Sequence, residues 1–171
     1  MSKRKIQLAV TGPESSGKTV LSIQLAELLS FHLVEEYSRI YLKELNKPYG
    51  LMDIVAISKG QQKLERSAMR SFVADTEQTV LKIWAEEKFG ECPAEIETAW
   101  ERQSYDHIFL CKPDLPWEPD PLRENPEDRD RLFDIYLKSL QSSGQSFSII
   151  EGQGDVRIQK ALEKLKSLHL L

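Results

Sequence analysis

Cysteine, histidine and long apolar runs are all scarce in this sequence. Its 171 residues include two cysteines, Cys92 and Cys111, and three histidines, with no CxxC pair and no cluster of the two residue types. This pattern predicts neither a disulfide framework nor a zinc site, and it favours a reducing cytoplasmic location. The apolar stretch at residues 6–10 is too short for a secretory signal. No apolar run approaches the roughly 18 residues that a membrane span needs.

Positive charge is also in short supply, since 23 Lys and Arg residues stand against 27 Asp and Glu residues and the formal net charge is −4. An acidic balance argues against a surface built to neutralise nucleic-acid phosphates. Hydrophobic residues make up 40% of the chain and charged residues 29%, which is ordinary for a globular protein. We therefore expect one domain over residues 1–171, a small-molecule ligand, and no nucleic-acid or membrane partner. The oligomeric state stays open.

Short apolar runs alternate with longer segments of helical period, which is the pattern of an α/β protein with a parallel sheet. The runs predict strands over residues 6–10, 31–36, 71–75, 107–111 and 147–150. The periodic segments predict helices over residues 20–29, 51–70, 76–88, 128–140 and 156–168. The expected fold is a five-stranded parallel sheet flanked by helices.

A phosphate-binding loop is the strongest motif in the chain. It matches GxxxxGK[ST] between a predicted strand and a predicted helix, with Gly12, Pro13, Glu14, Ser15, Ser16, Gly17, Lys18 and Thr19. The glycines let backbone N–H groups and the helix N-terminus point at phosphates. Lys18 is expected to reach the β- and γ-phosphates of ATP, and the Thr19 hydroxyl to bind Mg²⁺.

Carboxylates at the ends of predicted strands are the next candidates, because ligands of parallel sheets bind beyond the carboxyl ends of the strands. Asp75 ends the third strand and is expected to hold Mg²⁺ or its water, with a helix N-cap as the alternative. Glu36 is the candidate base for a substrate hydroxyl, with Glu35 as its competitor. Tyr37 and Arg39 would lie beside the same acceptor pocket, although residue type alone favours a solvated strand end with an ion pair as the role of Glu36.

A proline-rich stretch separates the fourth and fifth predicted strands. Five of the eight prolines lie within residues 112–130, so this stretch is neither an ordinary helix nor a central strand. We expect a lid at about 113–130 that brings an arginine to the transferring phosphoryl group, the alternative being a solvated surface excursion. Arg123 is the leading candidate, ahead of Arg129 and Arg131. Trp117 either stacks on a base or anchors the loop.

Two further turns lie at the predicted carboxyl edge of the sheet. Gly154 belongs to a glycine-rich turn that is placed to contact a nucleotide base or simply leads into the last helix. Residues 111–114, Cys-Lys-Pro-Asp, are similar to a guanine-reading NKxD with Cys in place of Asn, but no Asp is followed three residues later by Gly. A GTPase-like or ATPase regulatory module is therefore the alternative to an enzyme.

Several motifs together resemble the ribosylnicotinamide kinase domain of NadR-type proteins, a phosphate-loop kinase group. They are residues 12–19, Glu36-Tyr37-Ser38-Arg39, Gly60-Gln61, Asp75-Thr76-Glu77, Pro116-Trp117 with Asp120, and Leu122-Arg123, in the family's order. The resemblance implies a P-loop NTPase fold, ATP and Mg²⁺ as the donor system, and conversion of nicotinamide riboside to nicotinamide mononucleotide. Another nucleoside or small molecule is the alternative acceptor. The resemblance is broken at one position. Active family members carry an aromatic residue directly before the Glu-Tyr pair, whereas this sequence has Glu35 there.

Overall fold

One parallel sheet forms the centre of the molecule. The computed structural model describes residues 4–171, so the first three residues of the predicted domain lie outside the described part. The sheet contains β1 (Gln7–Thr11), β2 (His32–Val34), β3 (Phe72–Asp75), β4 (His107–Cys111) and β5 (Phe147–Ile150). Their order is β2-β3-β1-β4-β5, and each neighbouring pair is parallel. The predicted five-stranded parallel sheet is confirmed.

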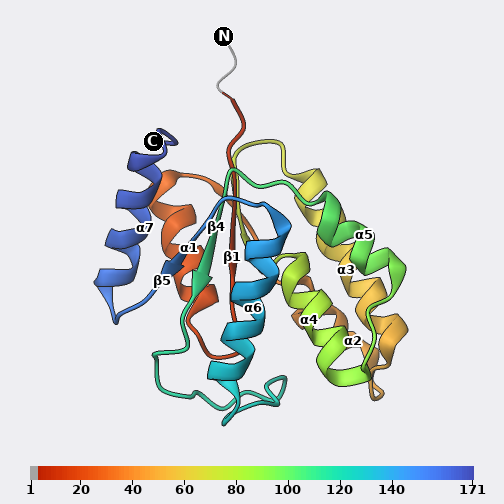
Figure 1. Cartoon of the computed structure of the whole chain (residues 1–171). Coiled ribbons are helices and arrows are strands. Elements are labelled where there is room, and N and C mark those ends of the chain that lie inside the picture. The colour runs from red at the N-terminus through yellow and green to blue at the C-terminus, as the bar shows by residue number, and fades with distance from the viewer. Residues whose placement is uncertain (1–3) are drawn as a thin grey trace.

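Helices cover both faces of this sheet (Figure 1). One face carries α1 (Lys18–Leu29) and α7 (Asp155–Ser167), whose apolar side chains pack on β1, β3 and β4. The other face carries α3 (Leu51–Ser67), α4 (Gln78–Phe89) and α6 (Arg129–Ser143). A third apolar cluster joins α3 and α4 to α2 (Tyr37–Leu45) and α5 (Ala94–Arg102). Among the described residues, no helix combines the length and apolar character needed to cross a membrane.

Apart from polar residues at their ends, the central strands are apolar because helices cover them on both sides. Leu8, Ala9 and Val10 in β1 are fully buried, as are Ile108 and the rest of the β4 run. The strand β5 lies at the edge of the sheet, where Ile149 is exposed. The short apolar runs of the sequence thus predict the middle of the sheet most directly.

The sequence pattern predicts neither α2 nor α5. Each has nine residues, and so short a segment has too few turns for helical periodicity to stand out. The strand β2 ends at Val34 and α2 begins at Tyr37, so the strand is shorter than the one predicted over residues 31–36. Glu36 is the N-cap of α2 and not the end of a strand. The two neighbouring acids therefore do not lie in one strand, so the alternation of side chains along a strand cannot decide which of Glu35 and Glu36 faces the site.

Residues 112–128 contain neither helix nor strand, so the predicted lid of about 113–130 ends earlier, where α6 begins at Arg129. We refer to residues 112–128 as the 112–128 segment. It leaves β4 and runs along the lower end of the molecule in Figure 1, past the carboxyl edge of the sheet. This course places it beside the loop at residues 12–19.

A glycine in α3 fixes the start of α2. A Cβ at Gly60 would lie 2.0 Å from Cε1 of Tyr37, which is closer than real contacts allow. The neighbouring Gln61 is buried, and its side-chain oxygen accepts a hydrogen bond of 2.9 Å from the backbone N–H of Tyr37. The two residues together hold the first turn of α2 and, with it, Glu36. Packing against α2 thus accounts for the Gly60-Gln61 motif.

We expect the substitution Gly60→Ala to destabilise the protein by about 1–3 kcal/mol, because the added methyl group displaces the Tyr37 ring. Without that clash, alanine inside a helix would stabilise by roughly 1 kcal/mol. Thermal unfolding measures the difference. Gly50→Ala is the matched control, since the nearest atom to its added Cβ, Oδ2 of Asp53, lies 3.9 Å away. A double variant with Tyr37→Ala should recover most of the loss, and additive losses would contradict the clash.

Candidate functional site

The loop at residues 12–19 connects β1 to α1 and bends sharply at its first residue. Gly12 has a φ of 139°, and a Cβ there would lie 2.6 Å from the backbone oxygen of Cys111. Glycine is required because other residues rarely adopt this φ and because the neighbouring atom is backbone. Gly17 is the N-cap of α1. The N-terminus of α1 therefore lies at the carboxyl edge of the sheet, where a helix binds anions.

Two side chains of this loop, Lys18 and Thr19, make hydrogen bonds that fix the loop at the edge of the sheet. The Lys18 Nζ atom donates hydrogen bonds to the backbone oxygens of Gly12, at 2.9 Å, and Pro13, at 2.8 Å. The Thr19 hydroxyl donates to Oδ2 of Asp75 at 2.7 Å. The sequence predicts Thr19 and Asp75 as ligands of one ion, and the structure places them in direct contact.

Asp75 is buried at the end of β3, with 4% of its surface exposed. Burial raises the pKa of its carboxyl above the ordinary value, and the hydrogen bond from Thr19 opposes that rise. Within the described chain, its Oδ1 atom is buried and has no hydrogen-bond partner. A free carboxylate oxygen beside a hydroxyl is the kind of hard oxygen donor set that Mg²⁺ prefers. The residues present therefore fit the predicted ion.

The turn after Asp75 is strained. Thr76 has a φ of 88°, which a β-branched residue rarely adopts. Its backbone N–H donates to the oxygen of Val10 at 3.1 Å, so the neighbouring strand fixes this conformation. Glu77 is the N-cap of α4 and accepts a hydrogen bond of 2.8 Å from the N–H of Thr79. The alternative role of Asp75 as the cap of this helix is therefore wrong.

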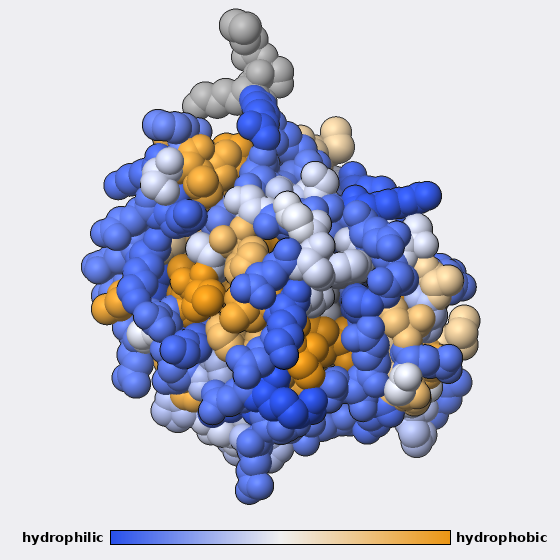
Figure 2. All heavy atoms as spheres, in the orientation of Figure 1, coloured by the Kyte–Doolittle hydropathy of each residue, from blue (hydrophilic) through white to orange (hydrophobic). Residues whose placement is uncertain are grey.

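A cavity of about 370 Å³ lies between the loop at residues 12–19, the helices α2, α4 and α6, and the 112–128 segment. Its apolar wall consists of Leu42, Val80, Ile83, Trp84, Leu132 and Tyr136. Figure 2 shows hydrophobic residues between α6 and α4. An aromatic wall and a cavity of this size suit a small planar ligand.

Glu36 faces this cavity, whereas Glu35 is exposed to solvent outside it. The Glu36 carboxylate accepts hydrogen bonds from the Ser38 hydroxyl, at 2.7 Å, and from Nε of Arg39, at 3.2 Å. Arg39 also donates to Oδ2 of Asp120 at 3.1 Å. Hydrogen bonds from the Leu122 backbone and from Arg39 hold the pKa of Asp120 below its usual range. Arg39 thus connects the acid in α2 to the 112–128 segment.

The cavity wall brings together most of the predicted site residues. They are Gly12, Pro13, Glu14, Ser15, Ser16, Gly17, Lys18, Thr19, Glu36, Arg39 and Arg123. Asp75 lies behind Thr19, through the hydrogen bond between them. The wall also contains Trp84 and Tyr136, which the sequence does not single out, because helical periodicity marks both simply as inward-facing positions.

Besides Asp75, Glu35 and Arg131, four predicted site residues lie outside the cavity wall. The ring of Tyr37 packs against Gly60, and Gly154 is the N-cap of α7. Arg129 donates to the backbone oxygens of Ser15 and Leu115, at 3.1 and 2.9 Å. Trp117 lies 5.6 Å from the guanidinium of Arg129. The placement of Trp117 agrees with an anchor for the loop, which was the alternative to base stacking.

Arg157 is a buried residue of α7 that no sequence motif indicates. Its Nε donates to the oxygen of Gly152 and its Nη2 to the oxygen of Lys112, both at 2.7 Å. Nη1 donates to the oxygen of Ser16, and Nη2 also pairs with Asp114. One guanidinium therefore joins the phosphate loop to the turns that follow β4 and β5.

The same contacts bear on residues 111–114, the segment that is similar to a guanine-reading NKxD motif. The Asp114 carboxylate is held by Arg157 and by the N–H of Gly152, at 2.7 Å. Burial acts to raise the pKa of Asp114, but these hydrogen bonds lower it below its ordinary value. Its carboxylate is committed to the fold, so the structure does not support guanine recognition by this residue.

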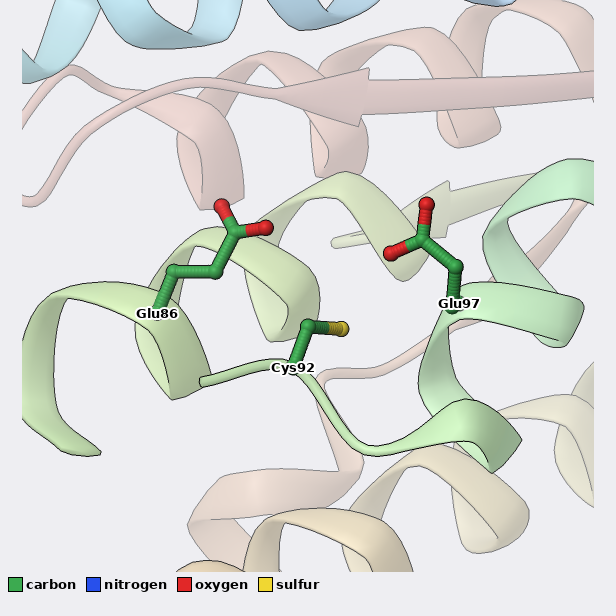
Figure 3. A group of neighbouring side chains, drawn as sticks. All are labelled: Glu86, Cys92 and Glu97. Carbon is green, nitrogen blue, oxygen red and sulfur yellow. The ribbon is translucent and has the colours of Figure 1, made fainter. Parts of the chain in front are cut away.

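A second group of possible metal ligands lies between α4 and α5, and Figure 3 shows its three side chains pointing toward one another. The ligand atoms of Glu86, Cys92 and Glu97 lie within 4.8 Å of one another. The Nζ atom of Lys82 donates to Glu86 at 2.9 Å and also pairs with Glu97. Burial raises the pKa of the Cys92 thiol to about 11. The ammonium group already balances these acids, and the thiol stays protonated, so we assign no ion here.

Comparison with known proteins gives one family match and many structural neighbours. The model of a family described as "AAA domain" matches residues 7–157. No curated protein matches the chain by sequence. A structure of NadR in complex with NR superimposes with a TM-score of 0.79 and 20% identity, over 98% of this chain and 52% of that chain. A structure of NadR with NAD and AMP-PNP gives a TM-score of 0.72 and 19% identity, over 96% and 49%.

A deoxyadenosine kinase from M. mycoides with bound dCTP gives a TM-score of 0.67 and 14% identity, over 95% of this chain and all of that chain. This chain spans about half the length of the two NadR chains. The likeness confirms the α/β phosphate-loop fold and, at the level of fold, the predicted resemblance to NadR-type proteins.

Proposed function

The chain belongs to the AAA domain family, and from this premise we propose that it transfers a phosphoryl group from ATP to a ribose hydroxyl of a nucleoside, with nicotinamide riboside as the leading acceptor. The observation that carries the proposal is the cavity, where a phosphate loop, a carboxylate and an aromatic wall face one another. The structural neighbours support it, since they include NadR with NR or AMP-PNP and a deoxyadenosine kinase.

The phosphate loop and the buried acid form the donor side of the proposed site. Backbone N–H groups of residues 12–19 and the N-terminus of α1 bind the phosphates of ATP. Lys18 exchanges its two backbone carbonyl partners for phosphate oxygens. Thr19 and Asp75 would hold Mg²⁺, which when bound neutralises charge on the phosphate oxygens.

On the acceptor side, Glu36 takes the proton of the substrate hydroxyl. The hydroxyl oxygen bonds to the γ-phosphorus, the bond from that phosphorus to the β,γ-bridging oxygen breaks, and ADP leaves. Arg123 lines the cavity from the 112–128 segment, and in this proposal it stabilises charge on the transferring group.

A nucleoside suits this cavity better than a nucleoside monophosphate. Arg39 is already paired with Glu36 and Asp120, and Lys88 is paired with Glu124 at 3.1 Å. A phosphate on the acceptor would have to break these pairs and would meet the carboxylates left behind. The apolar and aromatic side chains of the wall can pack against an uncharged or a cationic ring.

The proposal is tested by offering ATP and Mg²⁺ with a panel of acceptors and detecting the phosphorylated products by mass spectrometry. The panel contains nicotinamide riboside, purine and pyrimidine nucleosides, and the matching monophosphates. We expect a phosphorylated nucleoside and no reaction of the monophosphates. ATP binding without phosphorylation of any acceptor would overturn the enzyme assignment in favour of a nucleotide-regulated binding module.

We expect Glu36→Gln to lower turnover roughly 10²-fold while binding of an ATP analogue stays unchanged, because the amide cannot take the proton of the acceptor. Glu35→Gln makes the same change at a neighbouring residue that is exposed and outside the cavity. This control should keep nearly full activity. Steady-state kinetics measures both variants, and an equal loss in the two would remove Glu36 from the role of base.

A further inference from the structure

Glu14 is an acidic residue inside a loop that we propose binds phosphates. A carboxylate beside bound phosphates would repel them unless its charge is engaged elsewhere. In the structure it accepts hydrogen bonds from the backbone N–H groups of Glu124, at 3.0 and 3.1 Å, and of Asn125, at 2.9 Å. The side-chain amide of Asn125 adds a contact of 3.4 Å. The phosphate loop thus holds the 112–128 segment through its own carboxylate.

A second attachment point lies next to the first. The hydroxyl oxygen of Ser15 accepts a hydrogen bond from the N–H of Glu118, at 2.9 Å, and a weaker one from Nη1 of Arg123, at 3.5 Å. The segment is therefore fixed to the loop on both sides of Arg123. The position of the Arg123 guanidinium over the cavity follows from these two attachments.

We propose that Glu14 is a positioning residue that holds residues 118–125 closed over the cavity and so sets the place of Arg123. Opening of the segment would free the Glu14 carboxylate beside the phosphates, whereas closure engages it with backbone N–H groups. Donor binding and closure therefore favour each other, because phosphates bind better to the closed form. The catalytic consequence rests on the proposed function, but the hold on the segment does not.

Amide hydrogen exchange on the full chain without nucleotide tests the hold directly. In Glu14→Ala, the amides of Glu124 and Asn125 should exchange roughly 10-fold faster or more, since they lose a charged acceptor. Glu14→Gln should recover part of the protection, because the amide oxygen still accepts hydrogen bonds. Glu127→Ala removes an exposed acid from the same segment and should leave exchange unchanged. Unaltered exchange in Glu14→Ala overturns the proposal.

Kinetics separates positioning from a general loss of structure. We expect Glu14→Ala to lower kcat roughly 10-fold, with a melting temperature close to that of the parent protein. Glu14→Gln should restore much of kcat. Faster exchange together with unchanged kcat would overturn the role in placing Arg123. If the parent protein phosphorylates no acceptor while Glu14→Ala still exchanges faster, the proposed function fails and the hold on the segment stands.

Discussion

Replacing Asp75 with asparagine should lower the rate of phosphoryl transfer about 10³-fold and, at the same time, make the protein more stable at neutral pH. The loss of rate follows because Asp75 offers the charged oxygen that, with Thr19, would hold Mg²⁺, and such charge stabilisation contributes several kcal/mol. Asparagine keeps an acceptor for the Thr19 hydroxyl but carries no charge. The variant should still fold and bind an ATP analogue.

The gain in stability follows from the direction of the pKa shift. Burial raises the pKa of Asp75 above its unfolded value of 3.8. Between the two pKa values the folded protein binds more protons than the unfolded chain, so its stability falls as the pH rises through that window. Asparagine does not ionise and escapes this loss. Melting temperatures measured from pH 4 to pH 8 should therefore show the variant gaining on the parent as the pH increases.

Asp134→Asn is the control, because it makes the same chemical change at an exposed position of α6 outside the cavity. It should leave both the rate and the melting temperature unchanged. Full activity of Asp75→Asn would remove Asp75 from the donor site. An inactive variant that is also less stable at pH 7 would contradict the predicted gain in stability, because it would mean that neighbouring groups stabilise the charged Asp75 carboxylate in the free protein.

The parts of the site that the sequence predicts most directly lie at the ends of central strands. Thr19 and Asp75 are far apart in the chain, yet both follow strands of one parallel sheet, and the carboxyl ends of such strands share an edge. A recognisable strand pattern and a glycine-rich motif are therefore enough to place them together. The hydrogen bond between them confirms the contact, but their role in binding an ion remains a prediction.

The parts that the sequence does not predict depend on packing between helices. Tyr37 stands in a motif beside Glu36, which suggests a ligand contact. Its ring instead packs on α3, in the space that a side chain at Gly60 would occupy. Trp84 lies on the inward face of α4, and periodicity cannot tell a core position from a cavity wall. The first outcome follows from how α2 packs against α3, and the second from how α6 packs against α4, and such contacts leave no local pattern in the chain.

Arg157 is the clearest case of a residue that only the fold reveals, and its loss should be the most destabilising change of those considered. It is 4% exposed, and its guanidinium serves three backbone oxygens and the carboxylate of Asp114. Arg157→Ala removes the buried partner of all four acceptors, although the Asp114 side chain is partly exposed and keeps the hydrogen bond from the N–H of Gly152. Because only the arginine of this pair is buried, we expect a loss of about 3 kcal/mol, the lower end of what breaking a buried ion pair costs, which is a fall of roughly 6–12 °C in melting temperature for a domain of this size.

Arg157→Lys provides the matched comparison, because lysine keeps the positive charge but lacks the planar fork that reaches several acceptors at once. We expect it to keep the pair with Asp114, to lose the contacts to Ser16 and Gly152, and to recover less than half of the stability. Binding of an ATP analogue should weaken in both variants, since the Ser16 carbonyl belongs to the phosphate loop. A lysine variant as stable as the parent would mean that charge alone suffices and that the three-way connection is not required. Denaturant titration with analogue binding on the same samples separates these outcomes, because a loop that has merely lost its anchor binds weakly at denaturant concentrations where the fold is still intact.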